Sequence, residues 1–346
     1  MHFFRKKRTE EKAFSLSALT LKRFKKEKMG MVSLVFLLFV FLMAILGYLL
    51  TPDKTPYCNE QHLEIALRSP GFSVYFLKTP KEPLALKVNV FHKMLYGQPA
   101  QYTMLPVADG DIGASFSDMP LVKRTYLLGT DRYGRDVLSQ LMLGARISLA
   151  VGFIAVFIAL FIGFMVGAIA GYYGGKIDAA FTWLINVVWS IPTLLLVIAI
   201  SFALGKGFWQ IFIAIGLTMW VDIARVVRGQ TLALKQQDFV EAGRALGFSN
   251  FRIIFKHILP NILGTLVVLS AANFSSAILM EAGLSFLGMG VQPPIPSWGM
   301  MMKENYAYIV LDKAYLAIIP GVAIMLLVLA FMLIGSALRN AMEVRR

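Results

Sequence analysis

The feature that most constrains this chain is a set of six apolar blocks, each near the roughly 20 residues that an α-helix needs to cross a bilayer. The blocks cover residues 30–50, 147–173, 179–205, 207–221, 262–291 and 314–338. Each block is apolar all round, whereas a helix on the surface of a soluble protein is apolar on one side only. The sequence therefore predicts an all-α polytopic membrane protein with six membrane-spanning helices.

The overall composition agrees with this class. Hydrophobic residues make up 57% of the 346 residues and charged residues only 16%, against about 45–50% and 25% in a soluble domain. This excludes a disordered chain, a nucleic-acid-binding domain and an ordinary cytosolic enzyme. The net charge of +14 would suggest a polyanionic partner in a soluble protein, but in a membrane protein it reports topology.

Basic residues cluster on one side of the predicted spans. The leader 1–29 is rich in lysine and arginine, and the segment between the fourth and fifth spans and the tail 340–346 are also basic. The positive-inside rule then places both termini in the cytoplasm of a cell whose inner membrane holds the chain. The leader can also be read as an anchor for anionic lipids.

A long loop, residues 51–146, separates the first two spans and is predicted to lie outside the cell. Its eleven basic and nine acidic residues nearly balance, and long loops are translocated regardless of charge. Strand-like runs at 72–77 and 84–91 are separated by prolines. We expect a small extracytoplasmic subdomain here.

The chain lacks the motifs of an enzyme. The nearest approach to a Walker A motif is Gly174-Gly175-Lys176, but Ala170 and Ile177 occupy positions that need glycine and serine or threonine. No histidine lies inside a predicted span, and the single cysteine and four scattered histidines form no metal cluster. The sequence predicts no catalytic residue, no metal site and no bound cofactor.

The most informative segment follows the fourth span on the cytoplasmic side. Asp238 and Glu241 have the spacing of a capping box that opens a helix, and Gly247 suits the position just after its end. Ser249 is a candidate cap for a second helix, which is expected to end or bend near Pro260. The first helix carries Arg244 and the small residues Ala242, Gly243 and Ala245, which would allow another surface to approach closely.

This segment resembles the permease subunits of bacterial binding-protein-dependent ABC importers. Their pattern is E-A-A, three residues, G, nine residues, I-x-L-P, and the matching residues here are Glu241, Ala242, Gly247, Leu259 and Pro260. The chain departs from the pattern at Gly243, where a second alanine is frequent, and at His257, where isoleucine would stand.

Further segments resemble the dipeptide, oligopeptide and nickel importer subfamily, and within it the second, C-type permease. They are LGTDRYGRDVLSQLMLGARISL (128–149), GYYGG (171–175), ARVVRGQ (224–230) and EAGLSFLGMGVQPPIPSWG (281–299). The resemblance covers residues 128–339 together with the leader and the first span. Residues 51–125 form a longer external loop than is usual in the subfamily.

The resemblance implies a type I importer permease fold, with its core in residues 147–339 and a cytoplasmic coupling loop at 229–260. The implied partners are a homologous permease, two cytoplasmic ABC ATPases that use ATP and Mg²⁺, an external substrate-binding protein and membrane lipid, with no nucleic acid. The short helix would be the coupling helix that docks on an ATPase. The implied coupling residues are Asp238, Glu241, Ala242, Gly243, Arg244, Gly247, Leu259 and Pro260.

Small and polar residues in the fifth span are candidates for the translocation pathway. They are Asn273, Ser275, Ser276 and the intramembrane acid Glu281. Such residues also mediate packing between helices in lipid, and a membrane carboxylate is either functional or the buried partner of a polar group in the same subunit. Pro192 and Pro320 lie inside predicted spans and should kink them.

Several functions remain open on sequence alone. The favoured function is import of short peptides, di- and oligopeptides, driven by partner ATPases, with nickel chelates or other small solutes as the alternative within the family. An ion-coupled secondary transporter would need more intramembrane charges and usually an inverted repeat. A membrane scaffold with no transport role would leave the coupling motif unexplained.

Overall fold

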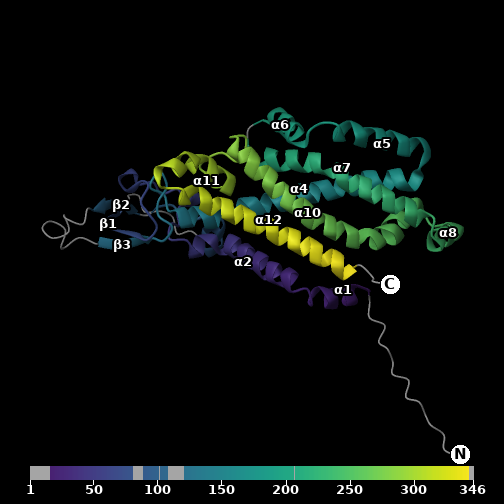
Figure 1. The fold of residues 1–346 in the computed structure, drawn as a ribbon, viewed down its shortest axis with the longest axis horizontal. Helices are drawn as coiled ribbons and strands as arrows, with labels where there is room; N and C mark the ends of the chain where they lie inside the picture. Colours follow the sequence, from purple (N-terminus) through teal and green to yellow (C-terminus); the bar gives the residue numbers. More distant parts are fainter. Residues whose placement is uncertain (1–15, 81–88, 101, 108–120, 206, 343–346) are drawn as a thin grey trace, which may run out of the picture.

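The computed structural model describes residues 16–80, 89–100, 102–107, 121–205 and 207–342, and five long apolar helices form the body of this described part. They lie side by side along the long axis, with a small sheet at one end and the short helix α8 (Asp238–Ala245) at the other (Figure 1). Helices suit lipid because their backbone hydrogen bonds are satisfied internally. The five are α2 (Lys28–Leu50), α4 (Val137–Tyr173), α7 (Phe208–Lys235), α10 (Leu259–Phe286) and α12 (Tyr315–Met342).

The predicted third span, residues 179–205, is not one continuous helix. It is divided into α5 (Gly175–Trp189) and α6 (Thr193–Leu204), which are bent by 93° from each other. Pro192 stands at the break as the N-cap residue of α6, with ψ 122°, outside the helical range. Proline favours the end of the preceding helix, because it has no N–H to donate and its ring clashes with the preceding turn. With this pair counted as one bent span, the described residues provide up to six spans. Pro320, in contrast, lies inside α12 without ending it.

The tightest helix pair is α4 against α7. Gly163, Gly167 and Gly171 are four residues apart and therefore share one face of α4, which is turned toward α7. A Cβ added at Gly167 would collide with the backbone oxygen of Ala224 and lie 2.8 Å from the Cβ of Val227. Glycine at these positions lets the two backbones approach closely, as small residues do between membrane helices.

Gly167→Val should weaken this packing and lower the stability of the protein by about 1–3 kcal/mol, the usual cost of overpacking. The matched control is Gly229→Ala on α7, where an added Cβ meets nothing within 4 Å. Thermal unfolding of the two purified variants in detergent measures the difference. Equal melting temperatures for Gly167→Val and the parent would show that the close contact between α4 and α7 does not contribute to the stability of the protein.

The helix predicted after Ser249 runs directly into the fifth span. The Ser249 hydroxyl accepts a hydrogen bond from the Arg252 N–H at 3.3 Å, as expected of a cap. Helix α9 (Asn250–Arg252) continues through a π-helical stretch, η3 (Ile253–Ile258), into α10. The helix therefore does not end at Pro260. The wider π turn lies immediately before the proline, where the regular ladder loses a donor.

A three-stranded antiparallel sheet forms the core of the predicted external subdomain. Its strand order is β2 (Tyr102–Val107), β1 (Phe72–Pro80), β3 (Leu121–Tyr126), and Tyr75 of β1 pairs with Val107 on one side and Lys123 on the other. The predicted strand at 72–77 is confirmed. Of the predicted strand at 84–91, residues 84–88 lie outside the described part, and Val90 instead begins the helix α3 (Val90–Tyr96).

Short helices complete the end of the molecule that carries the sheet. They are the 3₁₀ turns η1 (Pro56–Cys58), η2 (Leu63–Ile65) and η4 (Tyr306–Leu311) and the helix α11 (Trp298–Asn305). Helix α4 begins ten residues before the predicted start of the second span at 147, because the Asp136 carboxylate accepts the Ser139 N–H at 3.1 Å and caps it earlier. Arg146 therefore lies within a helix rather than in the loop.

The last part of the leader is helical and packs on the last span. Helix α1 (Leu16–Phe24) places the buried Phe24 ring against Ala337 and Ala341 of α12. This contact fixes both ends of the described chain at one end of the molecule, the end that also carries α8 (Figure 1). Residues 1–15, which hold part of the predicted basic leader, lie outside the described part.

Candidate functional site

Helix α8 projects from the end of the helical body opposite the sheet (Figure 1). Its cap is Gln237, whose backbone is extended (φ −86°, ψ 146°) and whose side chain makes no capping hydrogen bond. The predicted capping box is therefore wrong, because Asp238 is already the first helical residue. Asp238 and Glu241 both lie in the first turn, where their negative charge complements the positive end of the helix dipole.

The end of α8 is closed by a Schellman motif. Gly247 has φ +73°, a left-handed conformation that glycine adopts without a Cβ penalty. Its N–H donates to the Arg244 carbonyl at 2.9 Å, and the Phe248 N–H donates to the Gly243 carbonyl at 3.0 Å. Gly247 therefore occupies the position expected from the sequence, and it turns the chain back toward the membrane helices.

The two faces of α8 differ. Val240 and Gly243 are buried, and a Cβ on Gly243 would lie 3.3 Å from the Phe248 ring of the same chain. Gly243 thus faces the subunit itself, and the expectation that it admits another surface is wrong. The exposed side chains of α8 are those of Asp238, Phe239, Glu241, Ala242, Arg244 and Ala245, and the C-cap residue Leu246 is exposed as well.

Aromatic contacts hold α8 on the membrane helices. The Arg244 guanidinium lies 5.2 Å from the centre of the Tyr172 ring, at the end of α4, and the Tyr172 hydroxyl donates to Asn250 at 2.9 Å. Phe248 stacks on His257 with ring centres 5.6 Å apart. These contacts connect α8 to the end of α4 and to the helix that continues from α9 through η3 into α10.

The coupling residues predicted at 259 and 260 lie at the start of α10, away from the exposed face of α8. Leu259 is partly buried and packs against the main hydrophobic core. Pro260 is exposed and follows the π-helical stretch. These two residues lie where the chain enters α10, whereas most side chains of α8 are exposed on the surface of the subunit.

The four pathway candidates on α10 divide into two pairs. Ser275 is buried, and its hydroxyl donates to the Val328 carbonyl of α12 at 3.1 Å. Glu281 has no exposed surface and accepts a hydrogen bond from the Ser285 hydroxyl at 2.6 Å. Asn273 is partly exposed and Ser276 is exposed. The chain therefore encloses Ser275 and Glu281 and leaves Asn273 and Ser276 accessible from outside the subunit.

Glu281 lies at a junction of elements at the end of the molecule that carries the sheet. Ser285, which donates to it, lies 3.4 Å from Ser297 between their hydroxyl oxygens, and Ser297 caps α11 by accepting the Met300 N–H at 3.2 Å. The other carboxylate oxygen of Glu281 has no hydrogen-bond partner among the described residues. This geometry matches the structural alternative for Glu281, a buried acid that bonds to hydroxyls of its own subunit.

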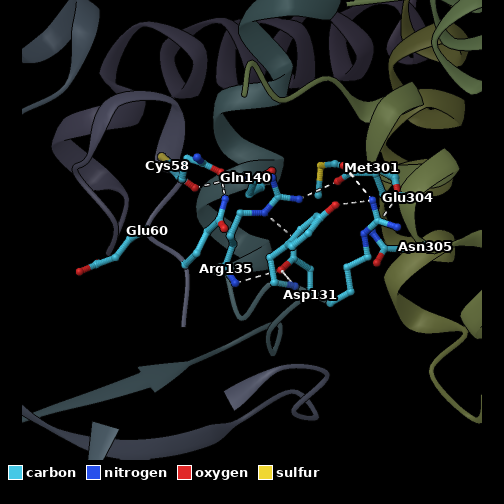
Figure 2. Close-up of polar contacts among 12 residues, drawn as sticks. Cys58, Glu60, Asp131, Arg135, Gln140, Met301, Glu304 and Asn305 are labelled. Atoms are coloured by element: carbon cyan, nitrogen blue, oxygen red, sulfur yellow. Dashed lines mark hydrogen bonds and ion pairs between the residues drawn. The ribbon is translucent and has the colours of Figure 1, made fainter. Parts of the chain in front are cut away.

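A buried cluster of charges joins the start of α4 to α11. Arg135 donates to Asp131 at 2.6 Å and to Glu304 at 2.6 Å, and all three side chains are less than 10% exposed. The Asp131 carboxylate also accepts the N–H groups of Tyr133 and Arg135 at 2.9 Å. Figure 2 shows the Arg135 side chain between Asp131 and the α11 residue Glu304. The cluster fixes α11 against the loop that precedes α4.

The sequence alone does not predict this cluster. Asp131 and Arg135 belong to the quoted segment 128–149 and are four residues apart, a spacing that favours an ion pair. Glu304 is 169 residues further along the chain from Arg135, and no local pattern connects the two.

A second ion pair closes the subdomain. Arg124 of β3 donates to Glu60 at 2.7 Å, and His62 Nε2 lies 3.6 Å from the other carboxylate oxygen. Burial opposes ionisation of this carboxyl group, but the neighbouring His62 and Arg124 outweigh it and lower the pKa of Glu60 to about 2. Glu60 is therefore ionised at neutral pH, and it ties the loop after α2 to the sheet.

Comparison with known proteins identifies the family. Residues 163–345, more than half of the chain, match the family described as the binding-protein-dependent transport system inner membrane component. The chain belongs to this family. Residues 15–70 also match the N-terminal TM domain of oligopeptide transport permease C. The protein is thus an ABC importer permease, a multi-pass inner-membrane subunit and not an enzyme, of a family that works with ATPase and substrate-binding partners.

Its relatives include the glutathione transport system permease protein GsiD. GsiD of Escherichia coli O6:K15:H31 (strain 536 / UPEC) is 43% identical over 215 residues, which cover 62% of this chain and 71% of the relative. GsiD of Shigella dysenteriae serotype 1 (strain Sd197) is 42% identical over the same shares. Among solved structures, the inward-facing MetNI methionine ABC transporter has a TM-score of 0.49 at 22% identity, covering 60% of this chain and 98% of that chain.

The residues singled out from the sequence lie in three separate regions of the permease. The exposed part of α8 lies at one end, on a base that includes Tyr172 and Phe248. Asn273 and Ser276 face outward from α10 in the membrane body. The quoted segments 128–149 and 281–299 lie at the other end, where they build the charge cluster and the cap of α11.

Proposed function

We propose that this permease forms half of the translocation pathway for short peptides and that α8 is the element through which partner ATPases move it. The observation that carries the proposal is the two-sided character of α8. Val240 and Gly243 rest on the subunit, and the apolar side chains of Phe239 and of the C-cap residue Leu246, which flank this side, remain 39% and 72% exposed. Exposed apolar groups of this kind mark contact surfaces.

The proposed assembly contains a homologous permease, two cytoplasmic ABC ATPases and an external substrate-binding protein. ATP and Mg²⁺ are used by the ATPases, because this sequence has no Walker A motif. Helix α8 lies at the same end as α1 and the end of α12 (Figure 1). Docking of α8 on cytoplasmic ATPases then places both termini in the cytoplasm and the sheet outside the cell.

We assign the pathway to the outward face of α10. Ala272 and Ser276 are exposed, and a Cβ added at Gly283 would meet nothing within 4 Å. The small residues leave space beside the backbone of α10, and Asn273 and Ser276 provide polar side chains there. Such a surface suits a peptide, whose backbone amides need hydrogen-bond partners. Ser275 and Glu281 act from within the subunit, by holding α10 to α12 and α11.

The similarity to glutathione permeases supports a peptide substrate. Those relatives are named as parts of a glutathione transport system, and glutathione is a short peptide. Nickel chelates and other small solutes remain the alternative substrates within the family, and uptake measurements distinguish them.

The purified chain alone should hydrolyse no ATP above a detergent blank, whereas the complete transporter should hydrolyse ATP and import peptide into vesicles. The assay compares uptake of a labelled dipeptide, glutathione and a nickel chelate, each with and without ATP. Hydrolysis by the isolated chain that survives repurification would contradict the division of labour. Uptake driven by an ion gradient without ATP would favour a secondary transporter instead.

A further inference from the structure

A short helix in the external loop, α3 (Val90–Tyr96), has no buried residue. Val90, Phe91, Leu95 and Tyr96 are 68%, 64%, 41% and 63% exposed. Phe91 and Leu95 are four residues apart and therefore share one face. His92 and Tyr96 share a neighbouring face, with ring centres 5.0 Å apart and ring planes tilted by 44°. A helix so short with four exposed large apolar side chains has no stability of its own in water.

The position of α3 is set by Arg146 of α4. Its guanidinium donates to the carbonyls of Met94 and Leu95 at 2.7 and 2.9 Å, and also to the carbonyls of Ala44 and Ile45 of α2, the latter at 2.8 Å. No acidic residue in the described part of the chain forms a salt bridge with Arg146. This arginine therefore uses its donors on backbone oxygens, and it fastens the end of α3 to α2.

The same contacts give the depth of α3. Ala44 and Ile45 lie five to six residues before the end of the span α2 at Leu50, which is about 8 Å at 1.5 Å per residue. The carbonyls at the end of α3 are thus level with a turn of a membrane-spanning helix. At this depth unpaired carbonyls are costly, and Arg146 pairs those of Met94 and Leu95. Gly97 follows in a tight turn with φ +78°, and it packs closely against Tyr48 of α2.

We propose that α3 is an interfacial helix that lies in the membrane leaflet on the side of the sheet, with Val90, Phe91, Leu95 and Tyr96 among the lipids. Its exposed apolar surface continues that of α2, where Leu49 and Leu50 are 44% and 58% exposed. Aromatic residues with a polar tip, such as Tyr96, suit the boundary between lipid and water. Lipid tails would cover all four exposed apolar side chains of α3, and no partner protein would be needed.

A spin label at residue 91 tests this placement in the assembled transporter in lipid vesicles. The single cysteine, Cys58, is fully buried, so a label on Phe91→Cys reports on α3 alone. Leu38→Cys on α2, 57% exposed, is the lipid-facing control, and Leu63→Cys in η2, 68% exposed, is the water-facing control. Each label is challenged with oxygen, which partitions into lipid, and with a water-soluble nickel chelate.

The collision ratio of oxygen to nickel at residue 91 should match that at residue 38 and exceed that at residue 63 several-fold. A ratio like that at residue 63 would place α3 in water and overturn the proposal. Low collision with both reagents would show that another protein covers this face, which would also overturn it.

The role of Arg146 has its own test in the Phe91→Cys background. Arg146→Met removes all the donors, and the label should become more mobile and more accessible to nickel. Arg146→Lys keeps the charge but not the planar guanidinium group, so the label should show a smaller change in the same direction. If the methionine variant does not accumulate, the lysine variant tests whether Arg146 holds α3. Labels that behave as in the parent would show that Arg146 does not hold α3.

Discussion

Ala242→Trp in α8 should abolish peptide uptake while the subunit still reaches the membrane in normal amounts. Ala242 is exposed on the outer side of α8, so an indole there has space in the free subunit. In the proposed complex it would stand between α8 and the ATPase, and a large side chain in a closely packed contact forces the surfaces apart. Uptake and substrate-stimulated ATP hydrolysis in the reconstituted transporter should both fall to background.

Two matched variants separate docking from folding. Ala242→Ser keeps the side chain small and should transport like the parent. Gly243→Leu points inward, where an added Cβ lies 3.3 Å from the Phe248 ring, so it should reduce the amount of folded subunit instead of uncoupling it. Full uptake by Ala242→Trp would show that α8 is only a connecting loop.

The structure also changes what is expected of Glu241. The capping box is absent, because Gln237 and not Asp238 occupies the N-cap position, and its side chain makes no capping hydrogen bond. Glu241→Ala therefore removes only the interaction of a charge with the helix dipole, about 0.3–1 kcal/mol. A severe transport defect in this variant, with normal insertion, would mean that Glu241 touches the ATPase directly.

Arg135→Met should destabilise the permease by about 3–5 kcal/mol, the usual cost of removing one partner from a buried ion pair. The substitution leaves Asp131 and Glu304 buried, with side chains 6% and 9% exposed. Arg132 lies 3.4 Å from Glu304 but is itself 37% exposed, so it replaces little of the lost charge. A lower melting temperature in detergent is the expected result.

The control neutralises the whole cluster. The triple variant Asp131→Asn, Arg135→Met, Glu304→Gln buries no charge, and the asparagine oxygen can still accept the N–H groups of Tyr133 and of residue 135. It should recover most of the stability that Arg135→Met loses, because a buried cluster of charges is often no more stable than a neutral replacement. If Arg135→Met has the same melting temperature as the parent, the cluster does not hold α11 in place.

Much of the membrane architecture could be predicted from the sequence. Uncharged apolar blocks identify helices that cross lipid, because no other open structure satisfies its backbone there. Local signals were also reliable where residues close together in the chain decide the geometry. Gly247 adopts the left-handed conformation, Ser249 caps the following helix, and residues 72–77 form a strand.

Local signals failed where neighbouring structure decides the outcome. Pro192 stands at a 93° break that divides its span, whereas α12 continues through Pro320, although both prolines stand in equally apolar sequence. Asp238 and Glu241 have the spacing of a capping box, yet the chain enters the helix one residue earlier, at Gln237. The spacing of residues shows which capping hydrogen bonds are possible. The path of the chain into the helix decides which of these hydrogen bonds form.

The sequence by itself determined the class of this protein, its family resemblance and the exposed helix at residues 238–245, because these depend on composition and on residues close together in the chain. Only the tertiary structure decided which side of that helix is free, which residues of α10 are enclosed, and that Arg135 meets Glu304. Each of these depends on side chains brought together from distant segments, such as Phe248 over Gly243 or α11 beside the start of α4. The periodicity and spacing of residues do not predict such contacts, because the contacts form only when the helices pack together.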